Sequence, residues 1–410
     1  MYMEDFDMEV KQNNNKRESS WETKKMPDVV KWSSGGTPKA TVKEYYENGD
    51  IPWLIIGDLN DGIVNTAATK ITELGLNNSS AKLVPAGTLL IAMYGSIGKL
   101  GITGMECCTN QAIAFAKEMY GVTTEYMFYY LSLMKSKLIS LGKGGTQKNI
   151  SLTVLNSIDV LVPPITEQQR IVEQIEELFS QLDSAVETLQ KTKQQLAVYR
   201  QAVLKEAFSN IKDTATIREV STLVTSGSRG WAKYYSNQGA KFIRIGNLTR
   251  DSIDIVFDDV QYVELPDKAE GLRSKLQPND VLVSITADLG SIGLVPQNIG
   301  EAYINQHIAV VRFKNTDQGK FMAWYLKSDY GQKDLLKNKR GAGKLGLGLD
   351  DIRDSKVPVV SDDVAESIVN IIEARISVCD SIEKTVDTAL QQAEAMRQSI
   401  LKKAFEGKLI

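Results

Sequence analysis

A helical heptad pattern that occurs twice constrains this chain more than any other feature of its sequence. Pro163-Pro164 ends the preceding segment, Thr166 stands in an N-cap position, and no Pro or Gly follows through Phe208. Apolar side chains then recur at alternating spacings of four and three, which places them along one face of a long helix over 167–208. This face, the seam, comprises Ile171, Ile175, Leu178, Leu182, Ala185, Leu189, Leu196, Tyr199 and Val203, and Thr192 interrupts it.

A second helix with the same pattern is predicted 197 residues later, over 362–406. At that offset Leu204-Lys205-Glu206-Ala207-Phe208 aligns with Leu401-Lys402-Lys403-Ala404-Phe405. A seam of this length requires a partner helix, so we predict that the two helices pack on each other. The second seam comprises Ile368, Ile372, Cys379, Ile382, Val386, Ala389, Ala393, Met396 and Ile400, with Arg375 as its polar exception.

The segments before the two helices also repeat. Gly95-Ser96-Ile97-Gly98 and Asn110-Gln111-Ala112-Ile113-Ala114 recur 195 residues later as Gly290-Ser291-Ile292-Gly293 and Asn305-Gln306-His307-Ile308-Ala309. Tyr130-Leu131 and Pro163 have counterparts at the same offset. Four matches at one offset indicate a tandem duplication of a globular module followed by a long helix.

Short strand-like runs broken by Gly, Asn and Pro indicate that each module is mixed α/β with antiparallel character, an α+β fold. We predict a helix over 124–141 in the first module, ended by Gly142. The expected divisions are a tail (1–20), a first module (21–163), the central helix (164–210), a second module (211–358) and the C-terminal helix (359–410). To pair along its length without a long return loop, the second helix must run antiparallel to the first. We therefore expect a rod of roughly 60 Å with a module at each end and pseudo-two-fold symmetry.

Composition excludes several classes of protein. The 410 residues carry a formal net charge of −3, so no overall basic field indicates nucleic acid. Three cysteines are too few for a disulfide framework and suit a reducing cytoplasm. No apolar run is long enough to span a membrane.

The sequence offers no convincing catalytic or metal site. Its one histidine, His307, aligns with Ala112 of the first module. Gly341-Ala342-Gly343-Lys344-Leu345-Gly346 superficially resembles a phosphate loop, but its spacing is wrong. A P-loop, HExxH, paired CxxC and a methyltransferase Asn-Pro-Pro-Tyr motif are all missing. We expect no resident cofactor or metal.

Two matched basic stretches are the candidate ligand-binding segments. No acidic residue lies between Tyr126 and Ile158, or between Leu335 and Leu349, and both stretches precede the last strand of their module. Recurrence in both modules favours a surface that faces a polyanion, and Lys, Thr, Gln and Gly suit phosphate and base-edge contacts. The predicted DNA contacts are Lys143, Thr146, Gln147 and Lys148 in the first module and Lys339, Arg340 and Lys344 in the second, with Arg229 and Arg244 as further candidates.

The chain resembles a specificity subunit of a type I restriction-modification enzyme. The resemblance rests on Pro163-Pro164-x-x-Glu167-Gln168-x-x-Ile171, the Gly145-Thr146-Gln147-Lys148-Asn149-Ile150 loop before it, the Leu-Lys-x-Ala-Phe helix ends and the duplicated plan. The start of the second helix departs from the family pattern, since Pro358-Val359-Val360-Ser361-Asp362 lacks Pro-Pro and Glu-Gln.

The resemblance implies a non-catalytic subunit that reads DNA. Each module would be a target recognition domain for one half of a bipartite, asymmetric site. The paired helices would set the spacer and dock two methyltransferase subunits, and a motor-nuclease subunit would join them. S-adenosylmethionine, ATP and Mg would bind only those partners. The alternatives are a coiled-coil scaffold that displays two protein- or glycan-binding modules, and a stand-alone enzyme, for which the sequence lacks a catalytic constellation.

Overall fold

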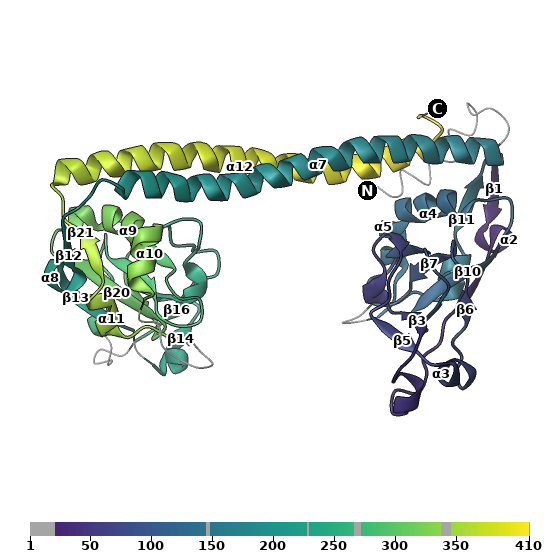
Figure 1. Ribbon diagram of the computed structural model, residues 1–410, viewed down its shortest axis with the longest axis horizontal. Coiled ribbons are helices and arrows are strands. Elements are labelled where there is room, and N and C mark those ends of the chain that lie inside the picture. Colours follow the sequence, from purple (N-terminus) through teal and green to yellow (C-terminus); the bar gives the residue numbers. More distant parts are fainter. Residues whose placement is uncertain (1–20, 145–147, 228, 266–271, 338–345, 410) are drawn as a thin grey trace. The chain divides into compact units, whose positions relative to one another are not determined.

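The computed structural model describes residues 21–409 except 145–147, 228, 266–271 and 338–345 (Figure 1). The chain divides into two compact units, Met1–Glu187 with Ala389–Ile410, and Thr188–Thr388. Unit 1 and unit 2, as we call them, each contain one globular module and a segment of both long helices. Thr146, Gln147, Lys339, Arg340 and Lys344 lie outside the described residues.

The module of unit 1 is built on two sheets and a two-stranded ribbon. The core of its larger sheet is Leu89-Leu90-Ile91-Ala92, an apolar run that is buried on both faces, as a central strand must be. That sheet has the order β2 (Val30–Ser34), β10 (Ile113–Met119), β7 (Leu89–Ala92), β8 (Leu100–Thr103) and β4 (Gly62–Val64). The second has the order β5 (Thr69–Ile71), β3 (Ile51–Leu54), β9 (Cys107–Thr109) and β6 (Leu83–Val84), and β1 (Glu22–Lys25) pairs with β11 (Asp159–Val162).

Where one helix was predicted over 124–141, the structure has two, α4 (Thr124–Leu133) and α5 (Lys135–Leu141). The chain turns at Met134, whose side chain is buried in the core. Gly142 ends α5 as predicted, although it does so in an extended conformation rather than a left-handed one. A shorter helix, α6 (Leu152–Asn156), precedes β11.

The module of unit 2 repeats the central strands of this topology, although its larger sheet has four strands where that of unit 1 has five. Its sheets have the orders β13 (Ser221–Ser226), β20 (Ile308–Phe313), β17 (Val281–Ser284), β18 (Ile292–Leu294), and β14 (Tyr235–Ser236), β16 (Gln261–Val263), β15 (Ala240–Ile243), β19 (Ala302–Ile304). The one parallel pair of the smaller sheet recurs, β3 with β9 and β15 with β19. The ribbon recurs as β12 (Thr214–Thr216) with β21 (Lys356–Pro358), and the helices as α9 (Gly319–Lys327), α10 (Asp329–Leu335) and α11 (Leu349–Arg353). The predicted α+β class and internal repeat are confirmed.

The two long helices, α7 (Ile165–Phe208) and α12 (Asp362–Phe405), have 44 residues each and run antiparallel within each unit (Figure 1). In unit 2, Lys193 contacts Asp387 at 2.8 Å, Arg200 contacts Asp380 at 2.5 Å, and Glu206 contacts Arg375 at 2.6 Å. The residue numbers of the paired side chains rise along α7 and fall along α12, which shows that the two helices are antiparallel. In unit 1, Asp183 forms an ion pair with Arg397. Arg200–Asp380 and Arg397–Asp183 are the same pair under the 197-residue repeat.

The seam of α12 differs from the prediction at two of its positions, while Ile368 and Ala389 are partly buried as a seam requires. Ile372, Cys379, Val386, Ala393 and Ile400 are buried, as expected for one residue per heptad. Ile382 and Met396, however, are 41% and 53% exposed. Their places are taken by the next residues, Glu383 and Arg397, which are ion-paired to α7. Spacings of three and of four both fit a heptad, and a sequence-based assignment passes over charged residues whose stems cover the seam.

The same displacement occurs on α7. Ala185 and Tyr199 are exposed, and Val186 and Arg200 are more buried than they are. Only 12% of the Arg200 side chain is exposed, because it bonds Asp380 and Glu383 on α12. Of the other predicted seam residues, Ile175 is buried, and Leu178, Leu182, Leu189 and Leu196 are partly buried.

A phenylalanine near the end of each long helix is buried against two aromatic rings of a module. In unit 1, Phe405 packs edge-on against Tyr126 and Tyr130 of α4, with ring centroids 5.2 Å away in both cases. In unit 2, Phe208 packs against Phe321 and Tyr325 of α9 at 5.5 and 5.3 Å. The repeated Leu-Lys-x-Ala-Phe motif thus closes the core of each module on a helix (Figure 1).

The joint between module and helix start uses a glutamine in both units. In unit 1, buried Gln168 of α7 accepts from the backbone N–H of Thr123 at 3.0 Å and donates to the carbonyl oxygen of Gly121 at 2.8 Å. In unit 2 the glutamine comes from the module. Gln318 donates to the carboxylate of Asp362 at 2.7 Å. The second helix therefore starts without the Glu-Gln pair, because its module supplies the amide.

We predict that Phe208→Ala lowers the free energy of unfolding of unit 2 by about 3–5 kcal/mol, because it removes a ring that is 3% exposed. Urea unfolding measures the change. Val198→Ala, on the same helix at 71% exposure, is the matched control and should change stability by less than about 0.5 kcal/mol. Equal losses in the two variants would contradict the role of Phe208.

Candidate nucleic-acid interface

The basic loop of unit 1 is anchored at the end of strand β7. Lys143 and Asn149 exchange backbone hydrogen bonds of 2.9 and 2.8 Å, which pair the two ends of the loop. The backbone N–H of Ile150 donates to the carbonyl oxygen of Met93 at 2.9 Å, and Tyr94 bridges to Asn149. This closure brings Lys143 and Lys148, both exposed, to the two sides of one stem.

The second basic stretch returns to the equivalent place in unit 2. The backbone N–H of Leu347 donates to the carbonyl oxygen of Ile285 at 3.0 Å, and Thr286 bridges to Gly346. Ile285 and Thr286 follow β17 as Met93 and Tyr94 follow β7. The two modules therefore attach their basic stretches to the same strand end.

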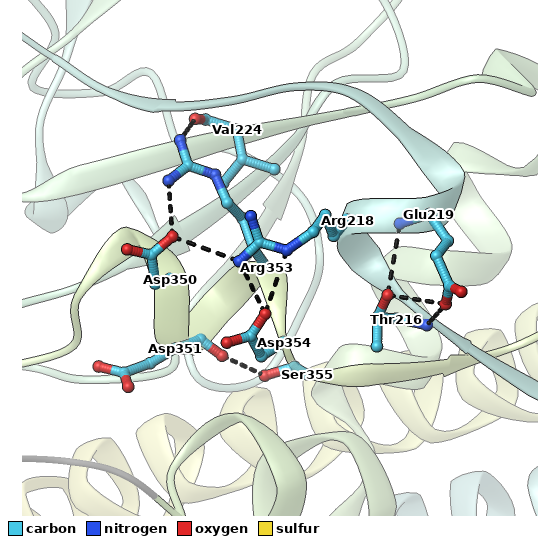
Figure 2. Close-up of polar contacts among 9 residues, drawn as sticks. All are labelled: Thr216, Arg218, Glu219, Val224, Asp350, Asp351, Arg353, Asp354 and Ser355. Atoms are coloured by element: carbon cyan, nitrogen blue, oxygen red, sulfur yellow. Dashed lines mark hydrogen bonds and ion pairs between the residues drawn. The ribbon is translucent and has the colours of Figure 1, made fainter.

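A charged cluster lies around α11, the helix that follows this stretch in the sequence of unit 2 (Figure 2). Arg218 donates to the carboxylate of Asp354 at 2.8 Å, and Arg353 donates to Asp350 at 3.0 Å and to the carbonyl oxygen of Val224 at 2.7 Å. Hydrogen bonds from Arg353 and then Arg218 hold the pKa of Asp350 below its usual value. Because Asp350, Arg353 and Asp354 lie in or next to α11, the cluster fixes the helix that follows the basic stretch.

Lysines gather beside the loop in unit 1. A groove at the end of β7 is lined by Asp61, Gly95, Ser96, Ile97, Lys99, Lys135, Ile139 and Lys148. Asp61 forms an ion pair with Lys135 at 3.1 Å, and Lys148 has no polar side-chain partner among the residues that the structure describes. Three ammonium groups against one carboxylate give this groove a local positive field in a chain of net charge −3.

The equivalent region of unit 2 contains different side chains. Arg250 bonds the carboxylate of Asp288 at 3.0 Å, and buried Lys327 donates to the carbonyl oxygen of Ser252 at 3.0 Å. Burial lowers the pKa of Lys327 to about 8. Its counterpart at the 195-residue offset in unit 1 is Ser132, so this buried ammonium belongs to one module only.

One glutamine in each module, Gln111 in unit 1 and Gln306 in unit 2, lies beside the loop stem. The sequence identifies both residues only as part of the internal repeat. The side-chain oxygen of Asn110 accepts a hydrogen bond from the backbone N–H of Ala112, and that of Asn305 accepts one from His307, both at 3.1 Å. Each bond forms a tight turn with the glutamine at its centre. Exposed Gln111 accepts from the hydroxyl of Thr37. Gln306 contacts His307 Nε2 at 2.9 Å.

In unit 2, His307 lies next to the loop stem. His307 Nδ1 is 2.7 Å from the hydroxyl of Thr286, the residue that bridges to the loop stem. Arg229 is exposed and comes shortly after Gly227, whose backbone N–H donates to the carbonyl oxygen of Ile308 at 3.3 Å. Gly35 makes the equivalent bond to Ile113, so Arg229 and Thr37 hold equivalent positions.

Arg244 differs from the other predicted contacts. Its guanidinium is 3.3 Å from the carboxylate of Asp259, and about a third of the side chain is exposed. Arg244 therefore has a partner within the module. Among the described ranges of the chain, no group of three or more His, Cys, Asp and Glu side chains could hold a metal ion, and no helix is long and apolar enough to cross a membrane.

Two mixed α/β modules, each followed by a long helix and each with a basic loop at the same strand end, define a duplicated recognition subunit. The family described as Type I restriction modification DNA specificity domain matches residues 18–197 and 206–392. The two matches cover most of the chain, which belongs to this family.

Individual relatives agree with the family assignment. The chain is 27% identical to the specificity subunit of the type I restriction enzyme EcoBI of Escherichia coli over 78% of its length and 73% of the relative's. It is 25% identical to the StySPI specificity subunit of Salmonella potsdam over 97% and 91% of the two chains.

Two solved structures share the fold. A chain from work on complex assembly and conformational transition of the type I R-M system aligns with a TM-score of 0.76 at 15% identity, covering 96% of this chain and 99% of that one. The HsdS subunit from Thermoanaerobacter tengcongensis aligns with a TM-score of 0.52 at 15% identity, covering 97% and 100%.

We predict that Lys327 makes unit 2 more stable as pH rises from about 8 to about 10.5. The pKa of this ammonium is lowered in the fold from 10.5 to about 8, so the unfolded chain binds more protons between these values. Relative to Lys327→Met, wild-type protein should gain about 2 kcal/mol of unfolding free energy between pH 8 and pH 10. Urea unfolding of both proteins at pH 8 and pH 10 gives the difference, and tyrosine ionisation cancels in it. A difference that does not change with pH would contradict the prediction.

Proposed function

We propose that this chain reads a bipartite, asymmetric DNA site, with each module contacting one half. The observation that carries this proposal is one scaffold with two sets of polar side chains. The same strand end is surrounded by Thr37, Gln111 and Lys148 in unit 1, and by Arg229, Gln306 and His307 in unit 2. Glutamine and arginine form bidentate bonds with adenine and guanine edges, so unlike sets would select unlike half-sites.

Lysines of the unit 1 groove would contact phosphates and supply affinity without sequence choice. Lys148 lines this groove together with Lys99 and Lys135, and Lys143, on the other side of the loop stem, would add to the set. Thr146, Gln147, Lys339, Arg340 and Lys344 remain proposed contacts on the sequence argument alone.

The subunit would itself catalyse nothing. Its helix pairs would dock two methyltransferase subunits, and a motor-nuclease subunit would complete the assembly. S-adenosylmethionine, ATP and Mg would bind those partners. The family assignment and the specificity-subunit names of the relatives support these roles.

The alternative is a scaffold whose modules bind protein or glycan. Binding of duplex DNA by the chain assembled with its methyltransferase partner, at several salt concentrations, separates the two functions. Affinity that falls steeply with salt supports DNA recognition. Assembly without duplex binding would favour the scaffold.

Lys143→Ala and Lys148→Ala should each weaken binding of all duplex sequences alike and reduce the slope of log K against log salt by about one. Fluorescence anisotropy with the assembled methyltransferase measures both quantities. Lys25→Ala is the matched control, because Lys25 lies on the ribbon strand β1 and is paired with Asp159. Variants that keep the wild-type slope would remove these lysines from the interface.

Lengthening both helices should lengthen the spacer of the DNA site. The insertion is one heptad after Thr192 and one near Ala389, which are opposed because Lys193 pairs with Asp387. Seven residues add about 10 Å of helix and nearly two full turns, so the part of each helix beyond the insertion rotates only slightly. At about 3.4 Å per base pair the spacer grows by at most about three base pairs, and the half-site sequences stay the same.

Sequencing of methylated adenines in cells that carry the lengthened subunit gives the result. A stable, active complex that methylates the original spacer would show that the helices do not measure the site.

A further inference from the structure

One solvent-exposed face of α12 in unit 2 carries large apolar side chains, where an exposed helix face is usually polar. Four large side chains of α12 are exposed, Val364 at 44%, Ile371 at 49%, Val378 at 59% and Ile382 at 41%. Their spacings of seven, seven and four are those of a helix-packing face, and none belongs to the seam that faces α7. Together they form the outer stripe, as we call this set.

The repeat supplies an internal comparison. The residues of α7 that are 197 positions earlier are Glu167, Gln174, Gln181 and Ala185. In unit 1 three of these four residues are polar and the fourth is an alanine, so no stripe of large apolar side chains stands at this place. The two helix pairs share one repeated ion pair and their aromatic ends, so this face can be compared between them position by position.

Carboxylates flank one end of the outer stripe. A shallow groove beside Ile371 is lined by Asp363, Glu366, Ser367, Asn370 and Ala374, with two acids and no basic side chain. Exposed Tyr199 of α7 borders the same helix pair close to Arg375, whose pKa is raised by Glu206 first and by Tyr199 to a lesser degree. A third helix that fits this surface needs apolar residues at heptad spacing and lysine or arginine beside them.

We propose that unit 2 offers the tighter of two unequal docking faces for a partner helix that is amphipathic and basic, carried by the methyltransferase subunit. The inference rests on the proposed function for the identity of the partner. Heptad spacing selects a helix, the apolar surface supplies affinity, and the carboxylates select basic flanking residues. The polar face of unit 1 binds the second copy more weakly, so assembly passes through a one-partner intermediate.

The experiment exchanges the two faces. Val378→Gln with Ile382→Ala gives unit 2 the residues of unit 1, and Gln181→Val with Ala185→Ile does the reverse. All four positions are exposed, so the fold tolerates both changes, and thermal unfolding checks it. Native mass spectrometry and calorimetric titration with the methyltransferase subunit of the same system measure the two binding steps.

We expect two unequal constants for the wild-type chain. The change in unit 2 should weaken the tighter step by about tenfold to a hundredfold, and the change in unit 1 should strengthen the weaker step. Two bound copies with constants that neither exchange alters would overturn this inference and leave the proposed function intact. Self-association of the chain alone that Val378→Gln with Ile382→Ala abolishes would also overturn it, since the outer stripe would then bind a second copy. Failure of the wild-type chain to bind the methyltransferase at all would instead count against the proposed function.

Discussion

Each module is completed by the end of a helix that began next to the other one. α7 starts at the Gln168 joint of unit 1 and ends with Phe208 in the core of unit 2, and α12 does the reverse with Phe405. The aromatic contacts are buried and nearly identical in geometry. Because neither core closes without them, the two long helices are parts of both folding units rather than linkers between them.

The charges in the seam determine how these helices pair. An all-apolar seam would stabilise several registers almost equally, whereas Arg200 with Asp380, and Arg397 with Asp183, satisfy each other only in the register observed. The guanidinium of Arg397 also lies 4.9 Å from the ring centre of Phe179, so it makes a cation–π contact in addition to the ion pair. The two ion pairs are related by the internal repeat, so the same interaction fixes the register in both units.

The repeats keep their packing and differ at their exposed ends. The central strands, the parallel pair of the smaller sheet and the aromatic closure are common to both modules. The side chains around the loop stems are not, and neither are the outer faces of the helix pairs. A subunit with one scaffold and two sets of surface chemistry can contact unlike partners at equivalent places, which suits the recognition of an asymmetric site.

The sequence by itself determined the duplication, the two long helices and the position of both basic loops. Periodicity and constant offsets are properties of the chain, and Phe208 and Phe405 could be aligned without coordinates. Only the tertiary structure decided which of two neighbouring residues in each heptad faces the partner helix. Ile382 and Met396 are apolar but exposed, and Glu383 and Arg397 are charged but paired, because pairing partners come from another part of the chain. For the same reason, the sequence alone could not show that Gln111 and Gln306 are more than matching residues of the repeat. Their place beside the loop stems depends on strands that lie next to each other only after folding.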